Sequence, residues 1–396
     1  MSETAFVVNT GIITAIGNNT EKNLDSLVNL KTGISKAEFL DTHWRNDFPV
    51  GEIKLSNQQL ADQLNIETEW PRTALLSAIA VKEAWKPFVE SAKGLRIGFL
   101  SANTVGGMDL SEKAYADLKT GNIELNKFKN HECGAITELV AEHFGIDHFV
   151  TTISTACSSS ANSIMMATQM IAAGMLDIAI AGGADSLSKF TLNGFNTLMI
   201  LDKEPSRPFD NTRKGLNLGE GAGYVVLMSK KAMQQCNAES ICCVSGYANA
   251  NDAYHQTASS PEGKGNTLAI KNALNKAGLQ PSDIDYINLH GTGTANNDSS
   301  EGKAIENIFG DKTPPASSTK TYTGHTLGAA GGVEAVYAAL SIKEGIIFPN
   351  LRWQYAMDDI SWQPTTQLQK GKNIKHVLSN SFGFGGNCSS IILSKS

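Results

Sequence analysis

Short apolar runs and longer helical patterns alternate along most of this chain. The apolar runs have the length of single strands and lie at 95–100, 149–155, 178–181, 224–228, 284–289, 376–378 and 389–393. A helical pattern follows the second run and stops at Gly174, and another follows residue 325. Strands that alternate with helices favour parallel sheet units, so the pattern predicts an α/β protein.

The pattern divides into two halves that echo each other so faintly that the repeat is predicted only together with the family resemblance given below. We predict units at 1–243 and 244–396, although α/β enzymes of 396 residues can also share one core. Helical patterns at 18–93 and 109–144 are predicted to be insertions that cap one side of the first half. The two units are therefore expected to carry the strands, and the insertions to surround them.

Cys157 lies between a β-rich stretch and a helical pattern, in Ser154-Thr155-Ala156-Cys157-Ser158. A thiol at a strand-to-helix turn lies near the positive end of a helix dipole, which lowers its pKa. A thiolate is the form that attacks thioesters. Free cysteine is also among the most buried residue types, so a core role is the competing interpretation.

Three later segments favour the catalytic interpretation. An apolar strand ends at His290 and leads into a Gly/Thr loop, and a second segment places Lys320 and His325 before a helix of small residues. The third is a glycine-rich turn at 379–387, whose backbone N–H groups could approach a ligand closely. Each segment alone could be purely structural, but the set in this order is much more specific.

Taken together, the four segments resemble the β-ketoacyl-acyl carrier protein synthases, the condensing enzymes of the thiolase superfamily. Nearly the whole chain takes part, from Val7-Val8-Asn9-Thr10-Gly11 to Phe384-Gly385-Gly386. The segment 320–325 is similar to the elongating Cys-His-His group. This resemblance implies a thiolase-like α-β-α-β-α sandwich of two pseudo-repeated halves, with the active site where the halves meet.

The resemblance also implies a division of labour in the condensation. Cys157 would hold the acyl chain as a thioester, and its N–H with that of Phe384 would form the oxyanion hole. A malonyl group on an acyl carrier protein would lose CO2. His290 and His325 would then donate hydrogen bonds to the resulting enolate, and either could accept a proton during acylation. The product would be a 3-oxoacyl group on the carrier protein.

Supporting residues follow from the same resemblance. Lys320 is expected to pair with Glu301 behind the histidines, or else to form a simple buried ion pair. Phe384 matches an aromatic gate beside the nucleophile. Phe195 could line the acyl tunnel or belong to the core.

Three threonines match positions that contact phosphopantetheine: Thr257, Thr292 and Thr294. Their alternative role is turn hydrogen bonding. The phosphopantetheine belongs to the acyl carrier protein, so no cofactor of the chain itself is expected.

Composition narrows the possible partners and locations. The net charge of −6 makes nucleic acid an unexpected partner. Six cysteines without disulfide-like spacing, no signal peptide after Met1, and no apolar run of about 20 residues together predict a cytoplasmic protein without a membrane span. The spacing in His131-Glu132-Cys133, and of His143 with His148, lacks a second ligand pair, so no metal is predicted.

Several alternatives remain open from the sequence. The turn ends in Gly386-Asn387-Cys388 where fatty-acid synthases usually have Gly-Thr-Asn, and 184–187 and 192–195 look more like synthases of aryl polyene or flexirubin pigments. Saturated and polyene chains are both possible, in a homodimer or a heterodimer. A catalytically silent subunit resembling a chain-length factor, or a degradative thiolase using Cys388, are further alternatives, although the intact nucleophile and histidines favour an active synthase.

Overall fold

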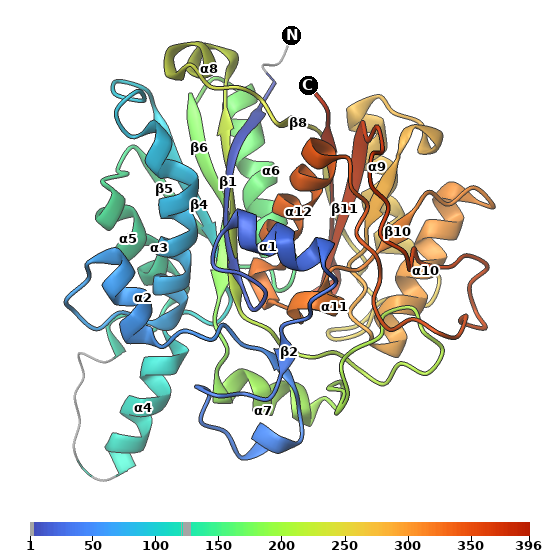
Figure 1. Cartoon of the computed structure of the whole chain (residues 1–396), viewed down its shortest axis with the longest axis horizontal. Helices are drawn as coiled ribbons and strands as arrows, with labels where there is room; N and C mark the ends of the chain where they lie inside the picture. Colours follow the sequence, from blue (N-terminus) through green and yellow to red (C-terminus); the bar gives the residue numbers. More distant parts are fainter. Residues whose placement is uncertain (1–3, 120, 122–127) are drawn as a thin grey trace.

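The strands form one ten-stranded mixed sheet that runs through the whole molecule. The computed structural model describes residues 4–119, 121 and 128–396 (Figure 1). The first half of the chain supplies β1 (Phe6–Thr14), β4 (Ile97–Ala102), β5 (Phe149–Ile153), β6 (Ile178–Asp185) and β7 (Gly221–Met228). The second half supplies β8 (Cys242–Asn251), β9 (Tyr286–Asn288), β10 (Ala316–Ser317), β11 (His376–Gly383) and β12 (Asn387–Ser394).

The strand order is the same in the two halves. From the centre outward it runs β1-β7-β6-β4-β5 on one side and β8-β12-β11-β9-β10 on the other. The halves join where β1 pairs antiparallel with β8, at Phe6 opposite Cys243 and Val7 opposite Cys242. In each half the outer strands pair in parallel and the inner ones antiparallel. This repetition is the predicted two-half α/β architecture; the boundary at 243/244 falls inside β8 and stays a prediction.

Helices lie outside and between the two halves of the sheet, which gives the five-layered sandwich (Figure 1). The inner layer consists of α6 (Ser159–Ala172) and α12 (Ala330–Glu344). The outer layers are α3 (Arg72–Trp85) with α5 (Cys133–Phe144), and α9 (Lys264–Ala277) with α10 (Ala295–Phe309).

The inner helix α12 is buried on every side, from Ala330 to Ile342. A Cβ at Gly332 would lie 2.4 Å from the Gly223 carbonyl oxygen of β7, so the small residues of this helix are required for its close approach to the sheet.

One predicted role in the first half is wrong. The range 18–93 was expected to be a capping insertion, but it contains α3, which packs on β1, β6 and β7 as a full layer of the sandwich. The helix α3 is buried on nearly all sides. This burial is expected because the sheet covers one face of α3 and other helices cover its outer face. Of the range 109–144, α5 covers β4 and β5, while residues 120 and 122–127 lie outside the described residues.

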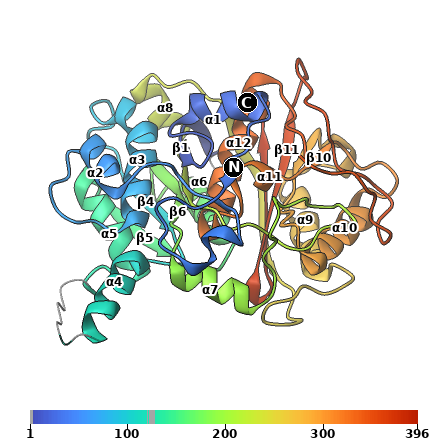
Figure 2. The ribbon, with the colours of Figure 1, turned by 60° about the horizontal axis from the view of Figure 1, so that its bottom comes forward.

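The remaining elements lie around the sandwich, several of them toward the end of the sheet at which the nucleophile lies, but the helix that follows β7 lies at the opposite end (Figures 1 and 2). They are α1 (Thr20–Val28), β2 (Ile34–Ser35), β3 (Val50–Gly51), α2 (Asn57–Leu64), α4 (Met108–Lys119), α7 (Lys189–Thr197), α8 (Lys230–Cys236) and α11 (Lys320–Thr323), with short 3₁₀ turns between them. None of the described helices has the length and apolar content needed to cross a bilayer.

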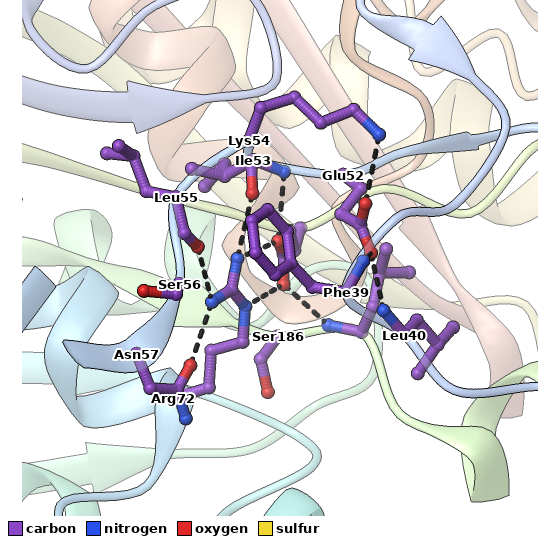
Figure 3. A network of polar contacts seen from close by, with 12 residues as sticks. Phe39, Leu40, Glu52, Ile53, Lys54, Leu55, Ser56, Asn57, Arg72 and Ser186 are labelled. Atoms are coloured by element: carbon purple, nitrogen blue, oxygen red, sulfur yellow. Dashed lines mark hydrogen bonds and ion pairs between the residues drawn. The ribbon is translucent and has the colours of Figure 1, made fainter. Parts of the chain in front are cut away.

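A buried ion pair fastens this surrounding layer to the sandwich (Figure 3). Arg72 of α3 donates from Nε and Nη2 to the two carboxylate oxygens of Glu220, at 2.8 and 2.6 Å. Its remaining donors reach the Ile53 and Leu55 carbonyls and the Asn57 side chain. Because every charge is paired and every contact is a hydrogen bond, this network holds the segment after β3 against the start of β7.

Candidate active site

Cys157 lies in a tight turn between β5 and the first turn of α6, as the sequence predicted. Ala156 has a φ of +54°, a left-handed conformation that a non-glycine residue adopts only under constraint. The Ser159 hydroxyl supplies that constraint, since it accepts from the Thr155 N–H at 2.8 Å and donates to the Ala156 carbonyl at 2.6 Å. The turn therefore holds the thiol at the sheet's end, where it is 7% exposed.

Two histidines from the second half of the chain converge on this thiol. His290 follows β9, and His325 follows α11. The Cys157 sulfur and a ring nitrogen of each histidine all lie within 4.8 Å of one another. The two rings are edge to face, with centroids 5.4 Å apart. The thiol and two histidines that lie more than 130 positions further along the chain thus form one buried cluster.

Hydrogen bonds fix the protonation of both rings. The Leu327 N–H donates to His325 Nδ1 at 3.0 Å, and Lys320 Nζ lies 3.3 Å from His290 Nδ1. An ammonium only donates, so both Nδ1 atoms accept and both Nε2 atoms carry the proton. Burial, followed by the charge of Lys320, holds the pKa of each histidine well below 6.5. Each ring is therefore a neutral donor.

This thiol and the two imidazoles are also spaced as a set of soft metal ligands would be. The Lys320 ammonium next to His290 Nδ1 disfavours a second cation there. The arrangement is better suited to stabilising an oxyanion, because both neutral imidazoles present N–H donors.

The predicted partner of Lys320 is wrong. Its ammonium forms a buried ion pair with Glu334 of α12, and not with Glu301. Burial raises the pKa of Glu334 to about 7, and the Lys320 charge opposes that rise. The sequence did contain a signal: Glu334 is the one charged residue between 330 and 342 in a run of small and apolar residues, and a buried charge needs a partner.

Glu301 instead holds the loop that carries His290. From α10, its carboxylate accepts the N–H groups of His290 and Gly291 at 2.9 and 2.8 Å, and the Asn380 amide at 3.1 Å. It is fully buried, and burial raises its pKa to about 7. Glu301 therefore contributes to the site by fixing the backbone of His290.

The predicted lowering of the thiol pKa is also wrong. Burial raises the pKa of Cys157 to about 11, against the opposing effects of Lys320 and of the N–H groups of Phe384 and Cys157 itself. The helix end and the nearby cation do not outweigh desolvation, so the protonated thiol is the resting form. The two N–H groups do face the sulfur, which is the arrangement expected of the predicted oxyanion hole.

Two cavities meet at Cys157. One, of about 280 Å³, is lined by both histidines and by polar residues that include the three predicted threonines: Thr257, Thr292, Thr294, Lys214 and Asn296. The other, of about 390 Å³, is mainly apolar; its walls include Val105, Met108, Phe190, Leu198 and Leu327. Phe195 and Phe384 line both cavities and stack on each other, with ring centroids 5.9 Å apart. Phe195 is thus a wall residue of the site.

Asn387 was interpreted from the sequence only as a departure from the family pattern. Its Oδ1 accepts hydrogen bonds from Ser158, Asn162 and Asn249, at 2.9, 3.2 and 2.6 Å. Ser158 follows the nucleophile, and Asn387 follows the turn of Phe384. The amide therefore ties the two segments that carry the candidate oxyanion donors. No sequence signal indicated this contact.

Comparisons with known proteins identify the class to which this fold and site belong. The family of the β-ketoacyl synthase N-terminal domain matches residues 3–232, and that of the β-ketoacyl synthase C-terminal domain matches 241–354. The chain belongs to the β-ketoacyl synthase family, whose solved members share its thiolase-like fold.

Individual relatives cover the full length of the chain. It is 31% identical to the 3-oxoacyl-[acyl-carrier-protein] synthase 2 of Staphylococcus aureus (strain COL), over 100% of this chain and 99% of the relative. The corresponding enzyme of Coxiella burnetii is 31% identical over 97% of both chains.

Two solved structures have the same architecture over their whole length. The ishigamide ketosynthase/chain length factor has a TM-score of 0.94 at 26% identity and covers 100% of both chains. The ketosynthase ApeO, solved in complex with its chain length factor ApeC from Xenorhabdus doucetiae, has a TM-score of 0.89 at 30% identity. It covers 100% of this chain and 98% of that one.

Proposed function

We propose that this chain catalyses the decarboxylative condensation of an acyl group on Cys157 with a malonyl group on an acyl carrier protein. The observation that carries the proposal is the cluster of one thiol and two neutral imidazoles where a polar and an apolar cavity meet. Membership of the β-ketoacyl synthase family supports the same reaction.

In the first half-reaction the acyl group moves to the enzyme. The carbonyl carbon of the acyl-carrier thioester bonds to the Cys157 sulfur, and the bond to the carrier sulfur breaks. The proton lost by Cys157 is taken up by the departing carrier thiolate, so the exchange is neutral overall. This balance suits a resting thiol of raised pKa and histidines whose Nδ1 atoms already accept hydrogen bonds.

The second half-reaction uses the histidines as donors. The malonyl carboxylate leaves as CO2, and its electron pair becomes the enolate of the carrier thioester. The Nε2–H groups of His290 and His325 stabilise that negative oxygen, each contributing about 10²-fold or more in rate. The enolate carbon attacks the acyl carbonyl on Cys157, whose oxyanion is held by the N–H groups of Cys157 and Phe384. Collapse releases the 3-oxoacyl product and the Cys157 thiolate, which takes up one proton from water.

The two cavities divide the substrates between them. The polar cavity takes the phosphopantetheine arm of the carrier protein, which Thr257, Thr292 and Thr294 contact. The apolar cavity takes the acyl chain. A saturated chain and a polyene chain both suit its walls; the sequence similarity to pigment synthases at 184–187 and 192–195 favours the polyene.

The chain works as a dimer, in the cytoplasm, with a related subunit beside the apolar cavity. Phe190, which lines that cavity, is 66% exposed, and Met199, two residues after α7, is 88% exposed. The strand β5 is the last of the sheet order and could pair with a second subunit. The ishigamide and ApeO structures contain a chain length factor, which favours a heterodimer over a homodimer. The intact cluster makes this chain the active subunit and not the silent one.

Mass spectrometry of both half-reactions tests the proposal. The protein, alone and with its candidate partner subunit, is incubated with hexanoyl-carrier protein, and the peptide that contains Cys157 is weighed. Malonyl-carrier protein is then added, and 3-oxo-octanoyl-carrier protein is expected. An adduct without this product would indicate a transferase, whereas no adduct under either condition would favour the silent subunit.

A further inference from the structure

We infer that Asp185 is a positioning residue that fixes His325 in its Nε2–H form and links it to the wall of the acyl cavity. Asp185 is the last residue of β6 and has no exposed surface. The condensation proposed above does not use it. The inference rests on the proposed function only for its kinetic consequence, because the state of the His325 ring can be measured without turnover.

The carboxylate of Asp185 binds two loops at once. Its Oδ1 accepts the N–H groups of Thr104 and Val105 at 2.8 and 3.1 Å. Its Oδ2 accepts the Thr104 hydroxyl and the Gly328 N–H, each at 2.7 Å. Among the described residues no lysine or arginine pairs with it. Four donors from two loops satisfy this buried charge, so the charge in turn holds the loops together.

The loop that contains Leu327 and Gly328 carries the contact that sets the His325 tautomer. Leu327, whose N–H donates to His325 Nδ1, has a φ of +54°. That left-handed conformation is strained for a leucine and persists only when neighbouring contacts hold it. The next residue supplies such a contact, since the Gly328 N–H binds Asp185. A Cβ at Gly328 would lie 2.8 Å from Asp185 Oδ2, so glycine is needed for this approach.

The loop that contains Thr104 and Val105 forms part of the wall of the apolar cavity. Thr104 and Val105 line it together with Leu327 and Gly328, on the wall beside Cys157. Asp185 lies behind that wall and touches both of its sides. A displacement of Thr104 or Val105 by a bound chain would therefore reach His325 through one carboxylate.

An amide cannot replace this carboxylate, although its shape is the same. Asparagine has one acceptor oxygen, and its NH2 group can only donate. In an Asp185→Asn variant the NH2 must face either the Gly328 N–H or the N–H groups of Thr104 and Val105. One loop is released in either orientation.

Nitrogen NMR of protein labelled with 15N-histidine tests the inference directly. The signals that disappear in His325→Gln are those of His325, and wild type is expected to show one tautomer with a protonated Nε2. Asp185→Asn should show a mixture of tautomers or exchange broadening at His325, with His290 unchanged. Gly328→Ala, which pushes the same contact apart, should do the same if Asp185→Asn folds poorly.

Asp177, which immediately precedes the opposite end of the same strand, provides a matched control. It is also buried, but it pairs with Arg96, at 3.0 Å, on the side away from the site. Asp177→Asn should leave the His325 signals unchanged. An unchanged His325 spectrum in folded Asp185→Asn or Gly328→Ala, or an equal change in Asp177→Asn, would overturn the inference.

The kinetic consequence separates positioning from general damage. Asp185→Asn should slow condensation by about 30-fold or more, because a mis-set donor is largely lost, while acylation of Cys157 stays within about threefold of wild type. Equal losses in both half-reactions would indicate a structural role and count against the inference. A wild type that never condenses would refute the proposed function, and the NMR result would still decide the inference.

Discussion

The two halves of this molecule share a strand order but contribute different chemistry. In the first half the strand β5 leads into Cys157. In the second half the equivalent strand β10 leads to Lys320 and His325, and β9 leads to His290. The repeated framework brings the ends of these strands together, and the loops decide whether a nucleophile or a donor stands there. The fold therefore sets the positions of these residues, and the loop residues set the reaction.

The largest expected effect tests whether the nucleophile belongs to the first half alone. Cys157→Ala should lose acylation and lower condensation by at least about 10³-fold, since nothing else in the cluster can form the thioester. The measurement is product formation together with the mass of the acyl adduct. Cys388→Ala, on β12 of the second half, should keep nearly full activity. A strong loss of activity in Cys388→Ala would support the thiolase alternative and show that the second half also supplies a nucleophile.

Removing the donors of the second half should give the next largest effect. His290→Ala or His325→Ala should each lower condensation by about 10²-fold or more, because one N–H to the developing enolate is lost. Single-turnover acylation of Cys157 should continue in both variants. His376→Ala is the matched control, since His376 lies at the start of β11 and binds Ser394 away from the site. If acylation fell as much as condensation, the histidines would act in acyl transfer instead.

The ion pair between Lys320 and Glu334 should contribute to the free energy of unfolding. Lys320→Met leaves the Glu334 carboxylate buried without a cation, and we expect a loss of about 3–5 kcal/mol in the free energy of unfolding. Urea denaturation measures it, and the double variant Lys320→Met with Glu334→Gln should recover most of the loss.

The partly exposed pair of Lys303 and Glu306 on α10, at 2.9 Å, gives the matched control. Lys303→Met should cost about 1 kcal/mol or less. If Glu301→Gln, and not Glu334→Gln, recovered the stability lost in Lys320→Met, the result would support the Lys320–Glu301 pair that the sequence predicted.

The smallest effect concerns the pH dependence that Glu301 adds to stability. Its pKa is raised by burial from 4.5 to about 7. The folded state therefore holds a proton that the unfolded state releases first, so this contribution is complete below pH 4.5 and is lost as the pH rises through 7. Between pH 4.5 and about 7, the free energy of unfolding should fall by about 2–3 kcal/mol less in Glu301→Gln than in wild type. Equal slopes in wild type and variant would contradict it.

The sequence could predict where the chemistry lies because strand-to-loop transitions are local patterns. Cys157 and His290 both follow apolar runs, and in a repeated α/β sheet such strand ends come together. The partner of Lys320 was not predictable in this way. Glu301 and Glu334 both lie on helices close to Lys320 in sequence, and the choice depends on how those helices pack.

Burial was the other quantity that the sequence did not provide. The raised pKa of Cys157 depends on how completely α6, the turn at Phe384 and the histidine loops exclude water from the sulfur. The role of α3 as a layer of the sandwich was missed for the same reason. A helical pattern in the sequence does not distinguish a helix that covers a sheet from a helix in an insertion. The contacts of Asp185 and Asn387 cross between segments that only the fold makes neighbours.

The inner layer of two helices has a consequence for how this protein can be divided. Because α6 comes from the first half and α12 from the second, and each is enclosed by both halves of the sheet, neither half has a complete interior of its own. A chain cut near residue 240 should give two fragments that aggregate when expressed separately and regain a folded core only when produced together. The duplicated architecture thus behaves as a single cooperative unit, and an ancestral half of this kind would have needed a second copy of itself to fold.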